Sequence, residues 1–545
     1  MFQTCSSRSF RYILMNYFVT MNCQVKVEQG TLQGKECKTF YGKKYYSFEG
    51  IPYAQPPIGK LRFGVKPWEG VLEALKPGNK CIQANPYSAT PIDGSEDCLY
   101  LNIYTPVLPH EKIQKLPVLF FIHGGRLIFG HGSYYTPDYF LKNDVILVTI
   151  NYRLHILGFL CLNIPECTGN MGLKDAALAL KWVNKNVASF NGDCENITVM
   201  GESAGAAIAT SFLTSKLVEN CFSKVIALSG TCISDLYMID EDPIAKGKHI
   251  ASLLGQNINE PKDIYKFLLN TPIDELLIAF TEAELSRSKT IINAYFLPVV
   301  EQKFPNETIF FTENPRISLK TNNFAKVPII NCIHSFEGAA FFGLNGKVNY
   351  INDFNCLLPR YANIDASKAK DTEKKIVQFY LGDKSPNDDC KIEYLTMMSD
   401  AYFTRDLMLV VEMISKFWDQ IYVLKFDYLG GMNTRVMKAL GLKGATHGDM
   451  IQYQFYRRNK AKNCTENDEK IIFVYGLGVS HNSTTPGPIW PILFLEYSIR
   501  YEDGSYGEKN LKNCLKMSKN NTFLYSIPYK RFVIIQVNKN FNTIT

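Results

Sequence analysis

The fold is decided by the stretch Ile197-Thr198-Val199-Met200-Gly201-Glu202-Ser203-Ala204-Gly205-Ala206-Ala207. A short β-branched run leads into it, and a run of small residues that suits a helix leads out of it. Between them lies Gly-x-Ser-x-Gly, the pattern of a nucleophile elbow, in which the turn is so tight that only glycine leaves room beside the serine. Chance alone would produce this pattern about 0.2 times in a chain of this length. The elbow therefore needs a base, an acid and an oxyanion hole elsewhere in the chain before it predicts chemistry.

Length and composition set the outer bounds. The chain has 545 residues, 46% of them hydrophobic, which suffices for one large α/β domain or for two to three ordinary domains. The net charge is +7, but lysines and arginines are dispersed rather than gathered into a stripe, which disfavours a nucleic-acid partner. No apolar stretch is long enough to form a transmembrane segment.

Buried strands and helices alternate on both sides of the elbow. Residues 118–122 form a continuous apolar run, as expected for a strand buried on both faces of a parallel sheet, and 145–150 is expected to be another buried strand. Residues 99–103 have the alternation of a half-buried strand. Further strands are expected at 224–228, 327–332 and 421–426, a helix at 174–186, and mostly helices over 235–320. This alternation predicts an α/β fold with a large, mostly parallel twisted sheet flanked by helices and with helical excursions. Residues 25–48 predict a small N-terminal β-meander.

The two ends of the chain are expected to stand apart from this domain. Residues 1–22 read as an N-terminal extension or a weak signal segment, 23–520 as a single domain, and 521–545 as a divergent C-terminal tail. The compartment stays open, because 15 cysteines with few expected bridges favour a reducing compartment, while five N-x-S/T sequons would matter in a secreted glycoprotein.

Four blocks carry a family resemblance. They are 96–102 (Glu-Asp-Cys-Leu-Tyr-Leu-Asn), 172–175 (Gly-Leu-Lys-Asp), the elbow at 201–205, and 444–449 (Gly-Ala-Thr-His-Gly-Asp). In this order and over roughly residues 25–500, the chain resembles a type-B, cholinesterase-like carboxylesterase, most similar to insect esterases. The resemblance implies the α/β-hydrolase fold and a serine esterase with a catalytic triad.

Ser203 is the expected nucleophile, and the fold's order of nucleophile, acid and histidine leaves His334, His447 and His481 as possible bases. His447 lies in the block that resembles the family's histidine loop, so the resemblance favours it, with His334 as a structural loop residue. Glu337 follows the strand expected at 327–332 and occupies the place of the family's acid, which would hold the histidine and stabilise its charged form.

The resemblance places the oxyanion hole at the backbone N–H groups of Gly125, Arg126 and Ala204. The family usually has glycine or alanine at position 126, so Arg126 is a departure. If this residue needs a positive φ, the arginine costs about 1–2 kcal/mol. Its side chain either crowds the site or attracts an anion there, or else it points into a neighbouring ion pair; the sequence leaves these alternatives open.

Further residues are assigned by the resemblance alone. They are Glu202 and Ser229 as supports of the triad, Cys81 and Cys98 as a disulfide, and Arg62 with Glu96 and Arg153 with Asp175 as structural ion pairs.

The resemblance implies a serine carboxylesterase that acts on small-molecule carboxylic esters, such as xenobiotic, lipid or odorant esters, in detoxification or odorant degradation. No metal and no organic cofactor is expected. Choline esters are disfavoured because the segment between Cys81 and Cys98 contains no tryptophan for binding a quaternary ammonium group. Glu202 stands where juvenile hormone esterases usually carry glutamine. The alternative is a scavenger that binds esters or organophosphates without turnover, because Arg126 impairs the oxyanion hole.

Overall fold

The computed structural model describes residues 23–57, 70–84, 92–111, 114–238, 242–287, 292–362, 364–469, 471 and 534–537. The domain ends expected at 1–22 and 521–545 lie outside the described residues, apart from 534–537, which form a strand. Within the described part, no helix combines the length and the apolar character that crossing a bilayer requires.

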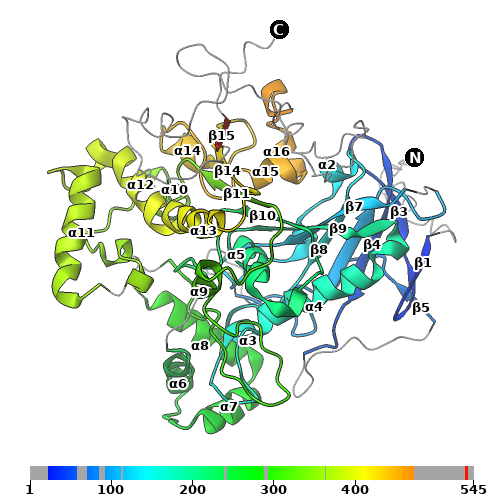
Figure 1. The fold of residues 1–545 in the computed structure, drawn as a ribbon, viewed down its shortest axis with the longest axis horizontal. Helices are drawn as coiled ribbons and strands as arrows, with labels where there is room; N and C mark the ends of the chain where they lie inside the picture. Colours follow the sequence, from blue (N-terminus) through cyan, green and yellow to red (C-terminus); the bar gives the residue numbers. More distant parts are fainter. Residues whose placement is uncertain are drawn as a thin grey trace, which may run out of the picture.

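A ten-stranded sheet forms the centre of the molecule (Figure 1). Its order is β15 (Ile534–Val537), β14 (Ile421–Phe426), β11 (Ile329–His334), β10 (Lys224–Leu228), β9 (Gly192–Glu202), β7 (Leu116–Ile122), β8 (Ile146–Ile150), β6 (Tyr100–Thr105), β4 (Lys44–Pro52) and β3 (Lys35–Lys38). From β15 to β8 every neighbouring pair is parallel, and β6, β4 and β3 continue the sheet antiparallel. The α/β-hydrolase fold with a large, mostly parallel sheet is therefore confirmed.

The buried runs of the sequence form the central strands. In β7 and β8 all residues but Pro117 are buried, because helices cover both faces of a parallel sheet. The strand expected to be half-buried, 99–103, overlaps β6 from Tyr100 onward, and in β6 only Tyr100 is partly exposed. The alternation of residue types there does not reflect a solvent-facing side, since Asn102 is buried and donates to Thr149 Oγ1 at 3.1 Å.

A small amino-terminal sheet is present, as expected, but it contains only part of residues 25–48. β1 (Gln24–Val27) and β2 (Gly30–Gln33) form an antiparallel hairpin that β5 (Val71–Glu73) joins in parallel. The next hairpin, β3 and β4, instead extends the edge of the large sheet. The local hairpins were predictable, but the choice of sheet depends on tertiary pairing.

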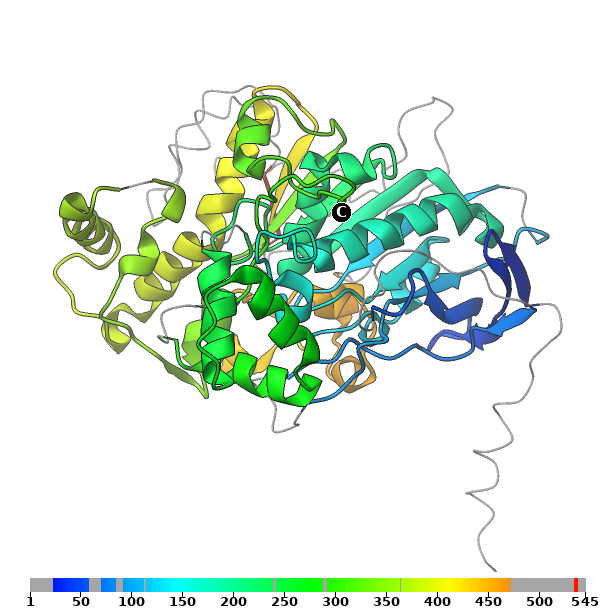
Figure 2. The same ribbon diagram turned by 90° about the horizontal axis from the view of Figure 1, so that it is seen from below.

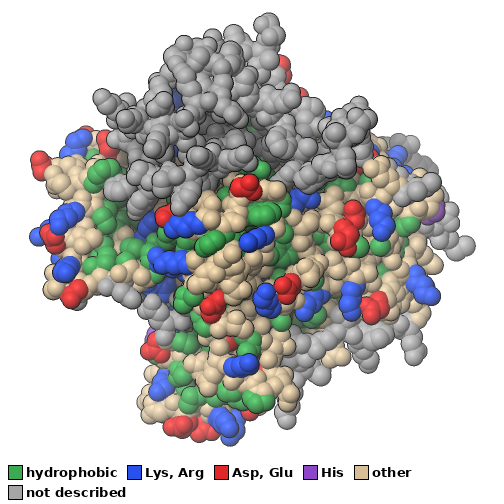
Figure 3. Space-filling model, in the orientation of Figure 1, with side chains coloured by type: hydrophobic (Ala, Val, Ile, Leu, Met, Phe, Trp, Pro, Cys, Tyr) green, Lys and Arg blue, Asp and Glu red, His purple; other side chains and the backbone are tan. Residues whose placement is uncertain are grey.

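The helices fall into distinct groups. In Figure 1, α6 (Pro243–Leu253), α7 (Pro261–Asn270) and α8 (Ile273–Leu285) form a group at the bottom, while α11 (Ala366–Leu381) and α12 (Lys391–Ser399) lie at the left. Figure 2 shows α4 (Met171–Asn186) running along the sheet. On the face drawn in Figure 3, Lys and Arg side chains are interspersed with Asp and Glu, as their dispersal in the sequence predicts.

Candidate active site

Ser203 lies at the turn between β9 and α5 (Ala204–Ser211), with φ +58° and ψ −123°. This backbone conformation is strained for a residue with a side chain. A Cβ at Gly201 would collide with the backbone of Gly205 and Ala206, and a Cβ at Gly205 would collide with the carbonyl of Ile122. The two glycines of the Gly-x-Ser-x-Gly pattern are therefore required by the close approach of β9, α5 and β7.

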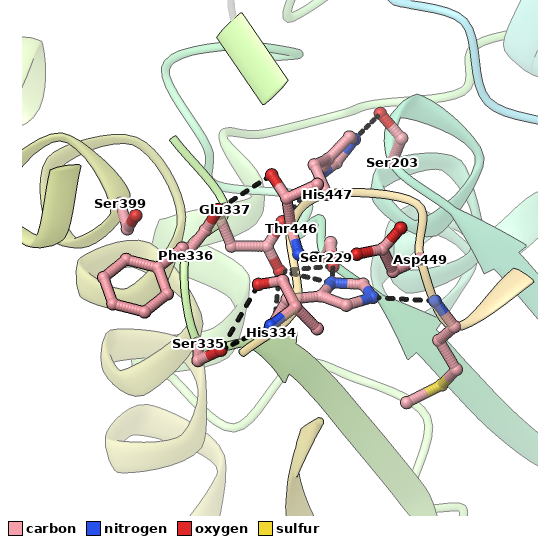
Figure 4. A network of polar contacts seen from close by, with 12 residues as sticks. Ser203, Ser229, His334, Ser335, Phe336, Glu337, Ser399, Thr446, His447 and Asp449 are labelled. Atoms are coloured by element: carbon pink, nitrogen blue, oxygen red, sulfur yellow. Dashed lines mark hydrogen bonds and ion pairs between the residues drawn. The ribbon is translucent and has the colours of Figure 1, made fainter. Parts of the chain in front are cut away.

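The sheet brings the predicted residues to one edge. Ser203 follows β9, Ser229 follows β10, Glu337 follows β11 and His447 comes after β14, which are four neighbouring parallel strands. Their carboxyl ends meet at the same edge of the sheet, where α/β folds bind ligands. Figure 4 shows the side chains of Ser203, His447 and Glu337 meeting there.

Hydrogen bonds link Ser203, His447 and Glu337 in a row. His447 Nε2 lies 2.8 Å from Ser203 Oγ, and His447 Nδ1 lies 2.7 Å from Glu337 Oε2. With its Nδ1 proton donated to Glu337, the neutral ring has Nε2 free to accept the hydroxyl hydrogen of Ser203. Burial alone would lower the pKa of His447, but the hydrogen bond and the charge of Glu337 outweigh it and raise that pKa above its ordinary value. This arrangement can deprotonate a serine hydroxyl.

Glu337 is fully buried, and its other oxygen is equally well held. Oε1 accepts hydrogen bonds from Ser229 Oγ at 2.5 Å, from His334 Nδ1 at 2.9 Å and from the His334 backbone N–H at 2.7 Å. The backbone N–H of Met450 donates to His334 Nε2 at 3.1 Å, which leaves the proton of a neutral His334 on Nδ1. Burial alone would raise the pKa of Glu337, but His334 and His447 hold it below its usual range, so the group is a carboxylate.

His334 was expected to be a structural loop residue, and in the structure it donates hydrogen bonds directly to Glu337. Its ring and backbone together supply two of the donors on Glu337. The sequence offered one signal, the three-residue spacing of His334 and Glu337 just beyond a strand. Ser229, expected to support the triad, also contacts the ring of His334 at 2.9 Å.

The histidine loop is held in place by Asp449, the last residue of the block at 444–449, for which the sequence predicted no role. Its buried carboxylate accepts hydrogen bonds from the backbone N–H of Thr434 and Thr446 at 2.6 and 2.9 Å and from Asn433 Nδ2 at 2.9 Å. Thr446 also pairs with Phe336 in an isolated parallel β-bridge, next to Glu337. The loops that carry the acid and the histidine are therefore joined directly.

Two aromatic rings and one carboxylate border His447. The ring of Phe403 lies 4.8 Å and that of Phe341 5.3 Å from the imidazole, centroid to centroid. Phe403 is part of a π-helical turn, Asp400–Thr404, a rare distortion that often occurs at functional sites. Glu202 Oε1 lies 3.4 Å from His447 Nε2, and burial raises the pKa of this carboxyl.

The turn after β7, where the oxyanion hole is expected, has three consecutive residues with positive φ. Gly125, Arg126 and Leu127 have φ values of +103°, +58° and +64° in succession. The positive φ considered for position 126 is thus present. It turns the loop back, so that the N–H groups of Ile128 and Phe129 both donate to the Gly125 carbonyl.

The side chain of Arg126 resolves the alternatives that the sequence left open. Its Nη2 pairs with Glu284 of α8 at 2.7 Å, and its Nε and Nη2 donate to the carbonyls of Ile292 and Asn293, each at 2.9 Å. Glu284 also pairs with Arg287 at 2.6 Å. The guanidinium of Arg126 is therefore held in a buried ion-pair network with α8.

Tyr237 is a residue that the sequence reading missed. It is 2% exposed, and its hydroxyl oxygen lies 2.9 Å from Ser203 Oγ. It sits in the turn after β10, eight positions beyond Ser229, and no motif marks it.

The remaining predicted contacts lie outside the triad. Arg153 and Asp175 form a buried two-point pair with N–O distances of 2.7 and 2.6 Å, and Cys81 and Cys98 form a disulfide. Arg62 lies outside the described residues, so its expected pair with Glu96 does too. Within the described part of the chain, no cluster of His, Cys, Asp and Glu side chains is arranged to hold a metal ion.

Comparisons with known proteins show the family of the chain. A family model described as "Carboxylesterase family" matches residues 22–475. Esterase E4 of Myzus persicae is 32% identical over 491 residues, which cover 84% of this chain and 87% of that protein. A juvenile hormone esterase of Heliothis virescens is 30% identical, with 79% of each chain covered.

A solved esterase structure has a similar fold. The crystal structure of juvenile hormone esterase from Manduca sexta, with OTFP covalently attached, has a TM-score of 0.73 at 26% identity and covers 83% of this chain and 88% of its own. The likeness thus extends over most of both chains in sequence and in fold. The chain belongs to the carboxylesterase family.

Proposed function

We propose that the chain hydrolyses carboxylic esters through a Ser203–His447–Glu337 triad and a covalent acyl-enzyme. The unbroken row of contacts from Ser203 Oγ through His447 to Glu337, at 2.8 and 2.7 Å, carries the proposal. Membership of the carboxylesterase family supports ester hydrolysis as the reaction.

In acylation, Ser203 Oγ attacks the ester carbonyl while His447 Nε2 takes its proton. The oxyanion rests on the backbone N–H groups of Gly125, Arg126 and Ala204. His447 then gives the proton to the departing alcohol. In deacylation a water molecule attacks the acyl-enzyme, its proton passes to His447, and Ser203 leaves with that proton. Glu337 stays ionised and stabilises the imidazolium throughout.

The surroundings of His447 favour apolar esters. Phe341 and Phe403 present aromatic rings beside the imidazole, and such rings offer a large apolar surface for contact with a substrate. Xenobiotic, lipid and odorant esters all fit this description. The scavenger alternative required the side chain of Arg126 to impair the oxyanion hole, and the pairing of that side chain with Glu284 does not favour it.

Hydrolysis of 4-nitrophenyl acetate by the purified protein tests the proposal. We expect Ser203→Ala to lower the turnover number by a factor on the order of 10³ or more. Ser215→Ala is the matched control, because this buried hydroxyl bonds the carbonyl of Phe310 at 2.9 Å, away from the triad. A fluorophosphonate should label the wild type and the control but not Ser203→Ala. Unchanged hydrolysis by Ser203→Ala would exclude the triad, and activity that appears only in Arg126→Gly would favour the scavenger.

A further inference from the structure

The hydroxyl of Tyr237 is a second polar group in contact with the reacting oxygen, beside His447. Ser203 Oγ has His447 Nε2 at 2.8 Å and the Tyr237 oxygen at 2.9 Å. Buried tyrosine hydroxyls usually need a hydrogen-bond partner. Among the described residues, Ser203 Oγ is the only hydrogen-bond partner recorded for this hydroxyl. The contact with Ser203 Oγ therefore meets the hydrogen-bonding requirement of the buried Tyr237 hydroxyl.

The direction of this hydrogen bond follows from counting protons. Ser203 has one hydroxyl hydrogen, and His447 Nε2 must accept it because Nδ1 carries the ring proton toward Glu337. The tyrosine must then be the donor to a lone pair of Oγ. Burial raises the pKa of Tyr237 well above neutrality, so the donor hydrogen is present throughout the working pH range. One lone pair of Oγ remains for attack on a carbonyl carbon.

The turn that carries Tyr237 is firmly anchored. Arg360 Nη2 donates to the carbonyls of Asp235 and Met238 at 3.0 and 2.7 Å, and Arg405 pairs with the Asp235 carboxylate at 3.4 Å. The N–H groups of Tyr237 and Met238 also close the turn on the Ser234 carbonyl. The hydroxyl is thus positioned in advance, as a group that stabilises a transition state must be.

We infer that Tyr237 is a further catalytic residue, which donates a hydrogen bond to Ser203 Oγ and chiefly accelerates deacylation. This inference rests on the proposed triad. In deacylation the bond from water oxygen to the acyl carbon forms and the bond from that carbon to Oγ breaks. The water proton goes to His447 and then to Oγ, while the tyrosine keeps its own proton. Its hydrogen bond draws electron density from the acyl–Oγ bond and stabilises charge on Oγ as that bond breaks.

Acylation gains less from the same contact. There, Oγ is the attacking atom, and a donor on one of its lone pairs also stabilises it before the reaction, so much of the benefit cancels. We therefore expect Tyr237→Phe, which removes only the hydroxyl, to slow deacylation by at least about tenfold and acylation by clearly less. A purely structural role would change both steps together.

A carbamate separates the two steps. The rate at which 4-nitrophenyl dimethylcarbamate inactivates the enzyme reports acylation of Ser203, and the rate at which activity toward 4-nitrophenyl acetate returns after its removal reports deacylation. Tyr104→Phe is the matched control, since its buried hydroxyl lies 3.1 Å from Glu49 rather than near the triad. The expected result is slow recovery in Tyr237→Phe alone, with inactivation near the wild-type rate.

Other outcomes overturn the inference in distinguishable ways. Recovery of Tyr237→Phe at the wild-type rate, or an equal slowing of inactivation and recovery, would refute it while leaving the triad intact. A wild type that is not carbamoylated and does not hydrolyse the acetate would refute the proposed function, and the inference with it.

Discussion

The ion-pair network around Glu284 allows a sharp prediction about stability. Glu284 Oε1 lies 2.7 Å from Arg126 Nη2 and 2.6 Å from Arg287 Nη2, and Oε2 accepts the Tyr295 backbone N–H at 2.8 Å. The carboxylate has a side-chain exposure of 5%, and the two guanidinium groups have 10% and 16%. One carboxylate thus pairs with two nearly buried guanidinium groups. Removing the carboxylate should therefore destabilise the protein more than removing one of the two arginines.

Glu284→Ala should leave two neighbouring guanidinium groups without their shared counter-charge. Breaking a buried pair in this way typically costs about 3–5 kcal/mol. Arg126→Gly instead leaves Glu284 with Arg287 and the Tyr295 N–H. That change loses the charge-assisted hydrogen bond to Glu284, about 1.5–3 kcal/mol, and the one to the Ile292 carbonyl, about 1 kcal/mol, whereas the Asn293 carbonyl keeps Arg287 Nη2 as a donor at 2.6 Å. It also relieves about 1–2 kcal/mol of positive-φ strain at position 126. We expect a net effect of less than about 3 kcal/mol.

Thermal unfolding at one scan rate measures the difference. With an unfolding entropy of about 2.1 cal/mol/K per residue, a chain of this size loses roughly 1 °C of Tm per kcal/mol. We expect a fall of about 3–5 °C for Glu284→Ala and less than about 3 °C for Arg126→Gly. Glu219→Ala removes the exposed Lys216–Glu219 pair as a control and should change Tm by less than about 1 °C.

An equal fall in Tm for Arg126→Gly and Glu284→Ala would refute this prediction, because Arg287 and the Tyr295 N–H would then not compensate the Glu284 carboxylate. An unchanged Tm for Glu284→Ala would also refute it, because Arg126 and Arg287 would then not need the carboxylate as a counter-charge. Arg126→Gly keeps the backbone N–H at position 126, so ester hydrolysis in the same preparation should stay within about tenfold of the wild type.

Three further predictions concern the acid, its support and the disulfide. Glu337 raises the pKa of His447 above 6.5, and only the neutral imidazole can act as a base, so activity should fall as the pH drops through that pKa. Glu337→Gln should shift this acidic limb of the kcat profile to lower pH and reduce the maximum kcat. Ser229→Ala removes the 2.5 Å hydrogen bond to Glu337 and should lower kcat by about tenfold with little change in KM, in steady-state assays of an ester. Replacing Cys81 and Cys98 together by serine opens a loop of sequence separation 17 and should cost about 3 kcal/mol, seen as a lower Tm that a reducing agent reproduces in the wild type.

Much of the site could be predicted because its residues follow strands that local sequence specifies. The strand expected at 421–426 has those bounds in the structure, and the apolar run at 118–122 lies within β7. Once strands are placed, the carboxyl-end rule and the order of nucleophile, acid and histidine select among a few candidates. These rules left three histidines as possible bases, and the resemblance of the block at 444–449 to the family's histidine loop selected His447.

The partners of Arg126 and the position of Tyr237 were not accessible in this way. Arg126 meets Glu284 across 158 positions, and Tyr237 is fixed by arginines more than 100 positions further along the chain. Neither contact follows from a repeat or a motif, because each depends on how a helical excursion packs over the sheet edge. Hydrophobic periodicity specifies which face of an element is buried but not which polar atom lies opposite it.

The geometry of the sheet explains why the histidine loop needs so much support. β9 and β14 are separated by β10 and β11, so at about 4.8 Å per strand their ends lie roughly 14 Å apart. His447 must therefore reach back across two strands to bring Nε2 to Ser203. Glu337, on the intermediate strand β11, meets the histidine on its way. A long loop would be mobile without internal bonds, and the buried Asp449 carboxylate together with the Phe336–Thr446 bridge supplies them. Strand order thus dictates which residues can form the site, whereas buried polar contacts within and between the loops determine whether their atoms meet at hydrogen-bonding distance.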